Sequence, residues 1–75
     1  MNNEDILSEF GRCLRKARIA RGLSQEKLAA IVNLGRTYIS LLERGKRNPS
    51  LVCIALLCNA LEVKLAKFFE QIDSY

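Results

Sequence analysis

Residues 35–50 read GRTYISLLERGKRNPS and carry three kinds of side chain in a regular arrangement. Ile39 and Leu42 are three positions apart, the spacing that places two apolar side chains on one face of a helix. Hydroxyl, aromatic and cationic side chains occupy the other faces, and the basic segment RGKRN follows before a proline. The stretch therefore predicts a helix that buries one face in a domain and offers polar groups to a partner on another.

The residues before this stretch predict an earlier helix that forms a helix-turn-helix with it over about residues 24–44. Ser24 suits the N-cap of the earlier helix, and the small Ala29 lies where two steeply crossing helices approach closely. Asn33 falls in the turn, where we expect a left-handed backbone that asparagine tolerates well. Four apolar residues then fill the angle between the helices: Leu28, Val32, Ile39 and Leu42. An ordinary helical hairpin is the alternative, because apolar periodicity alone also fits it.

Three further amphipathic segments complete an all-α, compact five-helix domain over residues 1–75. The first ends near Gly22 and has an apolar face of Ile6, Phe10, Cys13, Leu14 and Ala17. The segment Asn48-Pro49-Ser50 opens the fourth helix, whose predicted inner face comprises Leu51, Ile54, Leu57, Cys58 and Leu61. Leu65, Phe68, Phe69 and Ile72 mark the fifth. No segment alternates with the period of two that is typical of strands, so no sheet is expected.

The positive charge of the chain is concentrated in two places. Twelve Lys and Arg oppose eight Asp and Glu, for a formal net charge of +4. Residues 12–21 hold five of the cations and residues 36–47 hold four. This clustering favours a surface that faces a polyanion over evenly solvated charge. No apolar run approaches the ~20 residues of a membrane span, and the acidic N-terminal segment is unlike a signal peptide, so we expect a cytoplasmic protein.

The three cysteines, Cys13, Cys53 and Cys58, do not have the spacing of metal ligands. The chain contains no histidine, which leaves a zinc site short of ligands and removes the commonest general base. No Ser or Cys has an evident base partner. We therefore expect no metal, no cofactor and no enzymatic activity. The cysteines are interpreted as small apolar core residues in a reducing compartment, with redox sensing as the alternative.

The helix over residues 35–43 can be oriented by placing Ile39 and Leu42 inward, which turns its polar side chains outward. In a recognition helix the N-terminal residues lie deepest in the major groove. Arg36 can donate two hydrogen bonds to a guanine edge, and Thr37 can bond a base or touch a thymine methyl. The predicted base contacts are Arg36, Thr37, Tyr38, Ser40 and Leu41. For Arg36 and Tyr38, phosphate clamping is the alternative to base reading.

Two further groups of residues are expected to contact phosphates. The loop after this helix combines cations, backbone amides and the positive start of the next helix. The start of the earlier helix offers a hydroxyl and an amide on the other side of the groove. The predicted phosphate contacts are Ser24, Gln25, Arg44, Lys46, Arg47 and Asn48. A solvated basic loop without a ligand is the alternative.

Two segments, LRKARIARGLSQEKLA and GRTYISLLERGKRNPSL, resemble the Cro/repressor-type helix-turn-helix regulators known as the XRE family, which share a lambda-repressor-like DNA-binding fold. The similarity covers about residues 10–63. The RTYIS start of the recognition helix and the RGKRNPSL exit most resemble the controller proteins of restriction–modification systems. The resemblance implies a five-helix dimer and an ion pair between Arg18 and Glu43. Asn33 and Gly35 are mild departures, because the family often has glycine at the first position and a side-chain N-cap at the second.

The resemblance also implies a function. Such a controller binds palindromic operator DNA upstream of its own gene, with two dimers on adjacent sites as one arrangement. It activates at low occupancy and represses at high occupancy, so that the nuclease appears after the methyltransferase. A prophage-type repressor or the DNA-binding antitoxin of a toxin pair shares the fold, and a protein-interaction adaptor without DNA binding is an alternative of a different class. Glu26 is a candidate contact to the sigma subunit of RNA polymerase, unless it only complements the helix dipole.

The fifth predicted helix is expected to join two subunits through its apolar stripe of Leu65, Phe68, Phe69 and Ile72. Adjacent residues on a helix point 100° apart, so one phenylalanine should pack inward and the other should face outward. Two-fold pairing would cover the outward ring and place two recognition helices in successive major grooves. The alternative is that both rings close the core of a single subunit.

Overall fold

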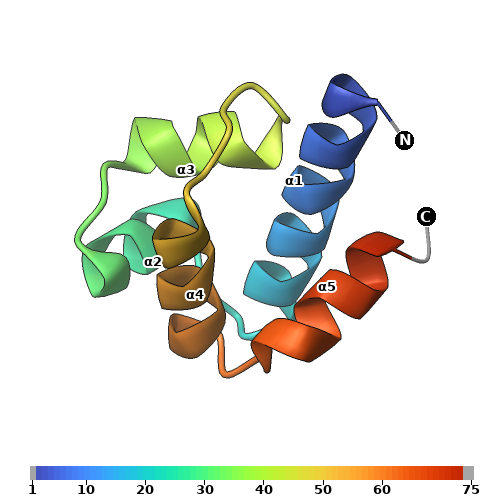
Figure 1. Ribbon diagram of the computed structural model, residues 1–75. Coiled ribbons are helices and arrows are strands. Elements are labelled where there is room, and N and C mark those ends of the chain that lie inside the picture. The colour runs from blue at the N-terminus through green and yellow to red at the C-terminus, as the bar shows by residue number, and fades with distance from the viewer. Residues whose placement is uncertain (1, 74–75) are drawn as a thin grey trace.

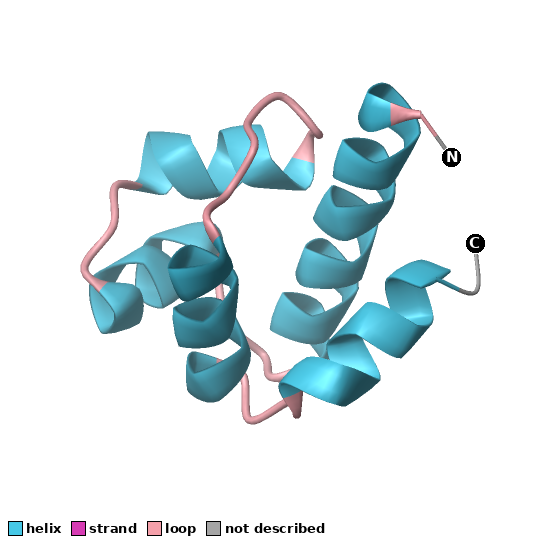
Figure 2. Ribbon diagram, in the orientation of Figure 1, coloured by secondary structure: helices cyan, strands magenta, loops and turns pink. Residues whose placement is uncertain are grey.

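The computed structural model describes residues 2–73, and these residues form five helices and no strand (Figure 2). The helices are α1 (Asn3–Ala20), α2 (Gln25–Val32), α3 (Arg36–Glu43), α4 (Leu51–Ala60) and α5 (Leu65–Asp73). In Figure 1, α2 and α3 lie on the left of the molecule and α1 and α5 on the right, with α4 between them. α1 packs against α3 and α5, and α4 packs against α2 and α5. The predicted all-α class with five helices is confirmed.

Side-chain caps start three of the helices. A hydroxyl or amide oxygen accepts a hydrogen bond from the backbone N–H three residues on, at the N-cap residues Asn2, Ser24 and Ser50. Gly35, which precedes α3, provides no side-chain cap. The recognition helix therefore begins without the local hydrogen bond that starts α2 and α4.

Each of the helices α1 to α4 is followed, within two positions of its last residue, by a residue with a left-handed backbone. These residues are Gly22 (φ 69°), Asn33 (φ 57°), Gly45 (φ 72°) and Glu62 (φ 57°). At each end, the N–H of this residue and the next N–H bond carbonyls of the last helical turn, which is the Schellman motif. The left-handed Asn33 agrees with the sequence prediction. Glu62 was not predicted there, because its Cβ strains this conformation.

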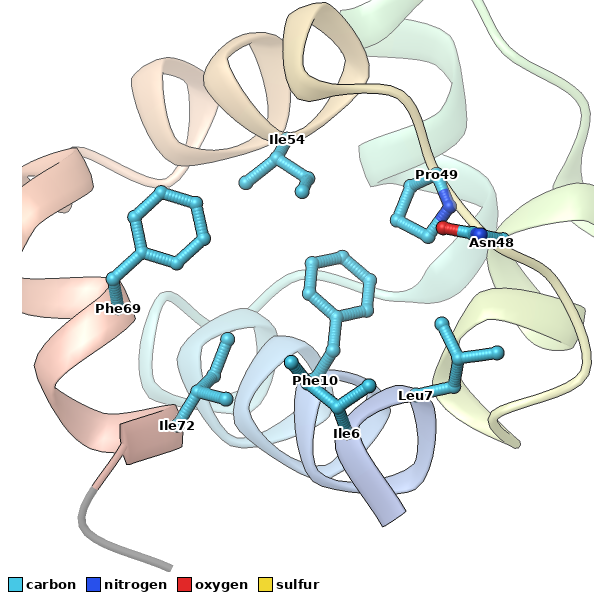
Figure 3. Close-up of a pocket in the computed structure, with 8 residues that line it drawn as sticks. All are labelled: Ile6, Leu7, Phe10, Asn48, Pro49, Ile54, Phe69 and Ile72. Carbon is cyan, nitrogen blue, oxygen red and sulfur yellow. The ribbon is translucent and has the colours of Figure 1, made fainter. Parts of the chain in front are cut away.

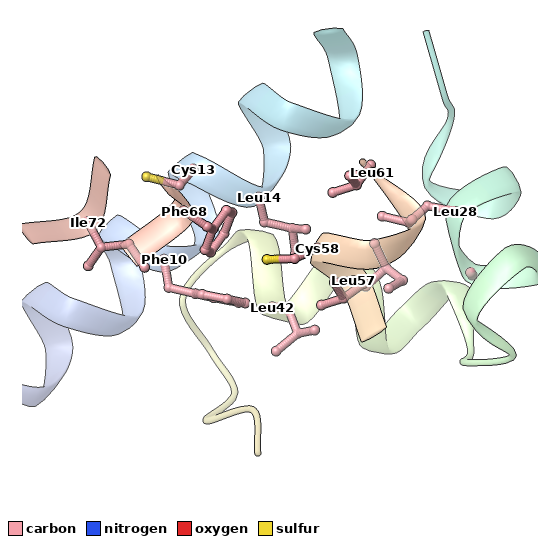
Figure 4. Packing of buried hydrophobic residues seen from close by; sticks show 12 residues of the cluster. Phe10, Cys13, Leu14, Leu28, Leu42, Leu57, Cys58, Leu61, Phe68 and Ile72 are labelled. Atoms are coloured by element: carbon pink, nitrogen blue, oxygen red, sulfur yellow. The ribbon is translucent and has the colours of Figure 1, made fainter. Parts of the chain in front are cut away.

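The core is a cluster of apolar side chains to which all five helices contribute (Figure 4). The rings of Phe10 and Phe68 meet edge to face, with their centroids 5.6 Å apart. Cys13 and Cys58 are buried, Cys53 is half-buried, and all three are free thiols. Burial raises the pKa of each thiol, which keeps the cysteines protonated and favours their role as small apolar residues.

Two residues that the sequence placed on inner faces lie at the surface instead. Leu51 is 64% exposed and Ile6 is 45% exposed. Leu51 is the first residue of α4, whose sequence LVCIALLCNA is apolar on nearly every face. Periodicity could not distinguish the inner face of such a helix from its outer face. Within residues 2–73, no helix has the length and apolarity needed to cross a membrane.

Gly11 sets how closely α1 approaches the end of α3. A Cβ at this position would lie 2.4 Å from the carbonyl oxygen of Glu43 and 2.5 Å from that of Leu42. These are backbone atoms, so they cannot rotate away as a side chain could. The absence of a side chain at Gly11 therefore allows α1 to support the recognition helix directly.

Candidate nucleic-acid interface

α3 exposes its first turn to solvent. Ile39 and Leu42 are fully buried, and this fixes the rotation of the helix about its axis. Arg36 and Thr37 are exposed, so both side chains are free to meet a ligand at the N-terminal end of α3. Ser40 lies one turn after Arg36 and is half-buried.

Tyr38 and Leu41 are less available than the sequence suggested. Leu41 was expected to be exposed, but it is half-buried. The packing of α3 against the rest of the domain covers part of the side of the helix that carries Leu41. Tyr38 is half-buried and packs against the core beside Cys53 of α4. Burial raises the pKa of the Tyr38 hydroxyl, and the neighbouring Cys53 raises it further. Part of the tyrosine surface thus holds α3 against α4.

The loop between α3 and α4 is a concentrated source of positive charge. Arg44, Lys46 and Arg47 are all exposed. Among residues 2–73, no ion pair neutralises these cations or Arg36. The four charges gathered in residues 36–47 therefore face solvent, as a surface for a polyanion requires.

The backbone of this loop is held against α1. Gly45 has a left-handed φ of 72°, and a Cβ there would lie 2.9 Å from the Cα of Ser8. Asn48 is exposed near the end of the loop, and Ser50 then caps α4. The loop is thus fixed at both ends, by a glycine contact on α1 and by the start of a helix.

The start of α2 offers a second group of polar side chains. Ser24 is exposed and its oxygen accepts the backbone N–H of Lys27 at 3.0 Å, which leaves the hydroxyl hydrogen free to donate. Gln25 is half-buried and its Nε2 donates to Glu43 Oε1 at 3.1 Å. Glu26 is exposed in the first turn of the helix.

The ion pair that the resemblance implied is present in the structure. Arg18 Nε donates to Glu43 Oε2 at 2.6 Å, and Arg18 Nη2 donates to Glu43 Oε1 at 3.0 Å. The Arg18 and Glu43 side chains are only 9% and 3% exposed. Arg18 Nη1 also donates to the carbonyl oxygen of Leu23 at 2.8 Å. The hydrogen bond to Glu43 raises the pKa of Arg18, and the pair ties α1 to the end of α3.

The basic cluster of residues 12–21 does not form the open cationic surface that the sequence suggested. Three of its five cations are used within the chain, in the ion pairs Arg12–Glu9, Arg18–Glu43 and Arg21–Glu62. Arg15 and Lys16 are exposed and have no ion pair in the described part of the chain. The acids that pair with Arg18 and Arg21 come from distant parts of the sequence, so the clustering of cations along α1 could not reveal them.

The apolar stripe of α5 is mostly used inside the subunit. Phe68 is 1% exposed and Ile72 is also buried. Leu65 is half-buried, and Phe69 is 38% exposed. The expected division into one inward and one outward phenylalanine therefore holds, and a dimer interface that includes Phe68 and Ile72 stays a prediction.

α4 carries an exposed apolar strip that the sequence reasoning missed. We call Leu51, Val52 and Leu56 the α4 strip; Val52, the most exposed of them, is 70% exposed. A hollow of about 140 Å³ also opens between α1, the α3–α4 loop, α4 and α5 (Figure 3). It is lined by Ile6, Leu7, Phe10, Asn48, Pro49, Ile54, Phe69 and Ile72. Exposed apolar surface of this kind commonly marks a contact with another protein.

Comparison with known proteins gives consistent results. A helix-turn-helix family model matches residues 14–68. The control protein C.MunI from Mycoplasma sp is 43% identical over 70 residues, which are 92% of this chain and 95% of that protein. The crystal structure of the restriction–modification controller protein C.AhdI from Aeromonas hydrophila has a TM-score of 0.80 and 48% identity, and the match covers 84% of this chain and 96% of that one.

A further solved structure shows a similar protein on DNA. It is the C.Esp1396I controller tetramer in complex with its natural 35-base-pair operator, with a TM-score of 0.83 and 39% identity. The match covers 92% of this chain and 91% of that one. The chain therefore belongs to the XRE-type helix-turn-helix family of DNA-binding transcription regulators, together with the restriction–modification controller proteins.

Proposed function

We propose that this protein controls a restriction–modification system by binding a palindromic operator as a dimer, activating at low occupancy and repressing at high occupancy. The observation that carries the proposal is the set of exposed cations after α3, which form no ion pair within residues 2–73, together with the exposed first turn of the same helix. The resemblance to controller proteins supports the same function, and the tetramer of C.Esp1396I on its operator suggests two dimers on adjacent sites.

We assign base reading to the exposed first turn of α3. We assign most of the base contacts to Arg36 and Thr37. Ser40 and the exposed parts of Tyr38 and Leu41 contribute further contacts from the side of α3. The phosphate contacts that we propose lie on both sides of α3, and they are Ser24, Gln25, Arg44, Lys46, Arg47 and Asn48. Substituting a base-reading residue should relax the preference at one base position, whereas substituting a phosphate contact should weaken binding to all sequences.

We propose that two subunits pair through the α4 strip, with Phe69 of α5 at its border. The α4 strip contains Val52 and Leu51, the two most exposed large apolar residues among residues 2–73, and α4 follows directly after the basic loop. Val52→Glu would place a charge in this interface, so it should convert the dimer to a monomer with its helicity retained. The matched control is Ile19→Glu, since Ile19 is a comparably exposed apolar residue on α1. Sedimentation of the wild-type protein as a monomer at tens of micromolar would remove the dimer from the proposal.

Activation also requires a surface that RNA polymerase can touch while DNA is bound. Glu26 is exposed beside the proposed phosphate contacts of α2, and its negative charge cannot favour a phosphate. We assign it a contact to a basic region of the sigma subunit. Glu26→Gln should leave operator affinity unchanged and reduce activated transcription with purified components. Unchanged activation would leave Glu26 with only the favourable interaction of an acid with a helix N-terminus.

DNA binding itself is tested by selecting duplexes from a random-sequence pool with the purified protein. A palindrome should emerge, with half-sites whose centres are about one helical turn, roughly 34 Å, apart. The six loop cations per dimer should lower the affinity about 10³-fold between 50 and 200 mM salt. A pool without enrichment would favour a protein-interaction adaptor over a regulator. Adjacent genes for an endonuclease and a methyltransferase would separate a controller from a prophage repressor or an antitoxin.

A further inference from the structure

The buried carboxylate of Glu43 has three hydrogen-bond donors around it. Two come from Arg18 and one from the amide of Gln25, whose Nε2 lies 3.1 Å from Glu43 Oε1. Glu43 is the last residue of α3 and Gln25 is the first residue of α2. The two ends of the helix-turn-helix are thus joined through one carboxylate.

The chemistry of the two groups fixes the orientation of the Gln25 amide. A carboxylate only accepts hydrogen bonds, so Gln25 must present its NH₂ group, and one of the two N–H donors is used. Gln25 is half-buried at the start of α2, and within residues 2–73 its amide makes the one hydrogen bond to Glu43, which leaves the second N–H for a ligand. The negative charge of Glu43 would repel a nearby phosphate, but the double hydrogen bond from Arg18 compensates that charge inside the protein.

We propose that Glu43 is a positioning residue for DNA binding, which holds the Gln25 amide so that its second N–H donates to a phosphate oxygen. Glutamine is among the side chains that lose most rotamer freedom when they are fixed. The hydrogen bond to Glu43 restricts this freedom before DNA arrives, which favours binding in the same way as other preorganised contacts. The inference rests on the proposed DNA-binding function and adds a residue that does not itself touch DNA.

The first test compares a neutral and a charged phosphate contact on a duplex selected by the wild-type protein. Gln25→Ala should weaken binding about ten- to hundredfold per subunit, the range for a lost hydrogen bond to a charged group. The slope of log affinity against log salt should stay unchanged, because a neutral amide releases no counterion. Lys46→Ala is the matched control, since it should lower the magnitude of the slope by about one unit per subunit.

The second test removes the Arg18–Glu43 ion pair that holds the Gln25 amide. Arg18→Met combined with Glu43→Leu deletes both buried charges together, which avoids leaving either one unpaired. In this background Gln25→Ala should change the affinity by less than about twofold. The entropy lost when a free glutamine side chain is ordered is similar in free energy to what its hydrogen bond to the phosphate contributes. Lys46→Ala should keep its full effect. An equal loss from Gln25→Ala in both backgrounds would overturn the inference.

A measurement on the wild-type protein covers the case in which the doubly substituted background does not fold. The two side-chain amide protons of Gln25 should be separated in chemical shift by clearly more than those of a solvent-exposed glutamine, and DNA addition should move one of the two signals. A chemical-shift separation like that of a solvent-exposed glutamine, or no effect of Gln25→Ala on a duplex that still binds the wild-type protein, contradicts the role of Glu43. Failure of the wild-type protein to bind any duplex contradicts the DNA-binding proposal instead.

Discussion

Residues 12–21 carry five cations and residues 36–47 carry four, but the two groups have different surroundings in the structure. Most of the first group pairs with acids of the same chain, and one of its members, Arg18, is buried against Glu43. The second group has no internal ion pair within residues 2–73 and surrounds the exit of the recognition helix. The first group contains the ion pair that joins α1 to the end of α3, whereas the second group remains available to a polyanion.

This difference shows what charge clustering in a sequence can indicate. A run of cations on a helix indicates neither which side chains turn inward nor which acids fold back against them. Arg18 and Arg21 pair with acids 25 and 41 positions away. The local sequence RGKRN, by contrast, lies in a loop whose side chains have few neighbours. A basic loop is therefore better evidence for a polyanion-binding surface than a basic helix.

The largest expected effect comes from separating the buried pair of the first group. Arg18→Ala or Glu43→Ala leaves a buried charge without its partner, which should lower the free energy of unfolding by about 3–5 kcal/mol. That is a large part of the stability of a domain of this size. Urea denaturation measures the loss, and the double substitution should cost less than the two single losses together. Additive effects below about 1 kcal/mol would place both side chains in solvent.

A smaller effect is expected where α1 touches the end of α3. Gly11→Ala replaces a poor helix former, which alone would stabilise the helix by roughly 0.5–1 kcal/mol. The added Cβ would lie 2.4 Å from a backbone oxygen of Glu43, so an overpacking cost of about 1–3 kcal/mol should exceed that gain and leave a net loss of about 1–2 kcal/mol. Gly35→Ala is the control, because nothing lies within 4 Å of a Cβ there. A thermal melt in which Gly11→Ala is the more stable variant would contradict the close approach.

The smallest expected effect concerns Arg21 and Glu62 at the far end of the first group. This pair is exposed, so Arg21→Ala should cost less than about 1 kcal/mol. Glu62→Gly should raise the free energy of unfolding by up to about 1 kcal/mol, because glycine adopts a φ of 57° without strain. Asn33→Gly, at the same φ, should gain less, since asparagine tolerates this conformation better. If Glu62→Gly lowered the free energy of unfolding more than Arg21→Ala does, the ion pair would contribute more to stability than the backbone strain at Glu62 costs.

Much of the fold could be predicted from local sequence. Apolar spacing located the five helices, Ser24 located the start of α2, and Asn33 located its left-handed end. Two features could not be predicted from the sequence because they depend on tertiary neighbours. Gly11 matters only through backbone atoms of α3, and the exposure of Leu51 follows from how an almost wholly apolar helix is rotated.

The candidate site was predictable to a similar degree. The polar first turn of α3 and the basic loop are local features, and both are exposed as the sequence predicts. The half-burial of Tyr38 and Leu41 depends on packing against the rest of the domain, and the use of Phe68 in the subunit core depends on its contact with Phe10. The contact between Gln25 and Glu43 joins residues 18 positions apart, which no local pattern indicates.

The contrast between the two basic groups is tested most directly by the salt dependence of binding to a selected operator. One variant replaces Arg44, Lys46 and Arg47 with glutamine, and the other replaces Arg15 and Lys16 of α1, which are exposed and have no ion pair within residues 2–73. With six loop cations per dimer on phosphates, the loop variant should lower the magnitude of the log–log slope by about five units. The α1 variant should change it by less than about one unit. Equal decreases in the two variants, or a larger decrease in the α1 variant, would contradict the assignment of DNA binding to the recognition helix and its loop.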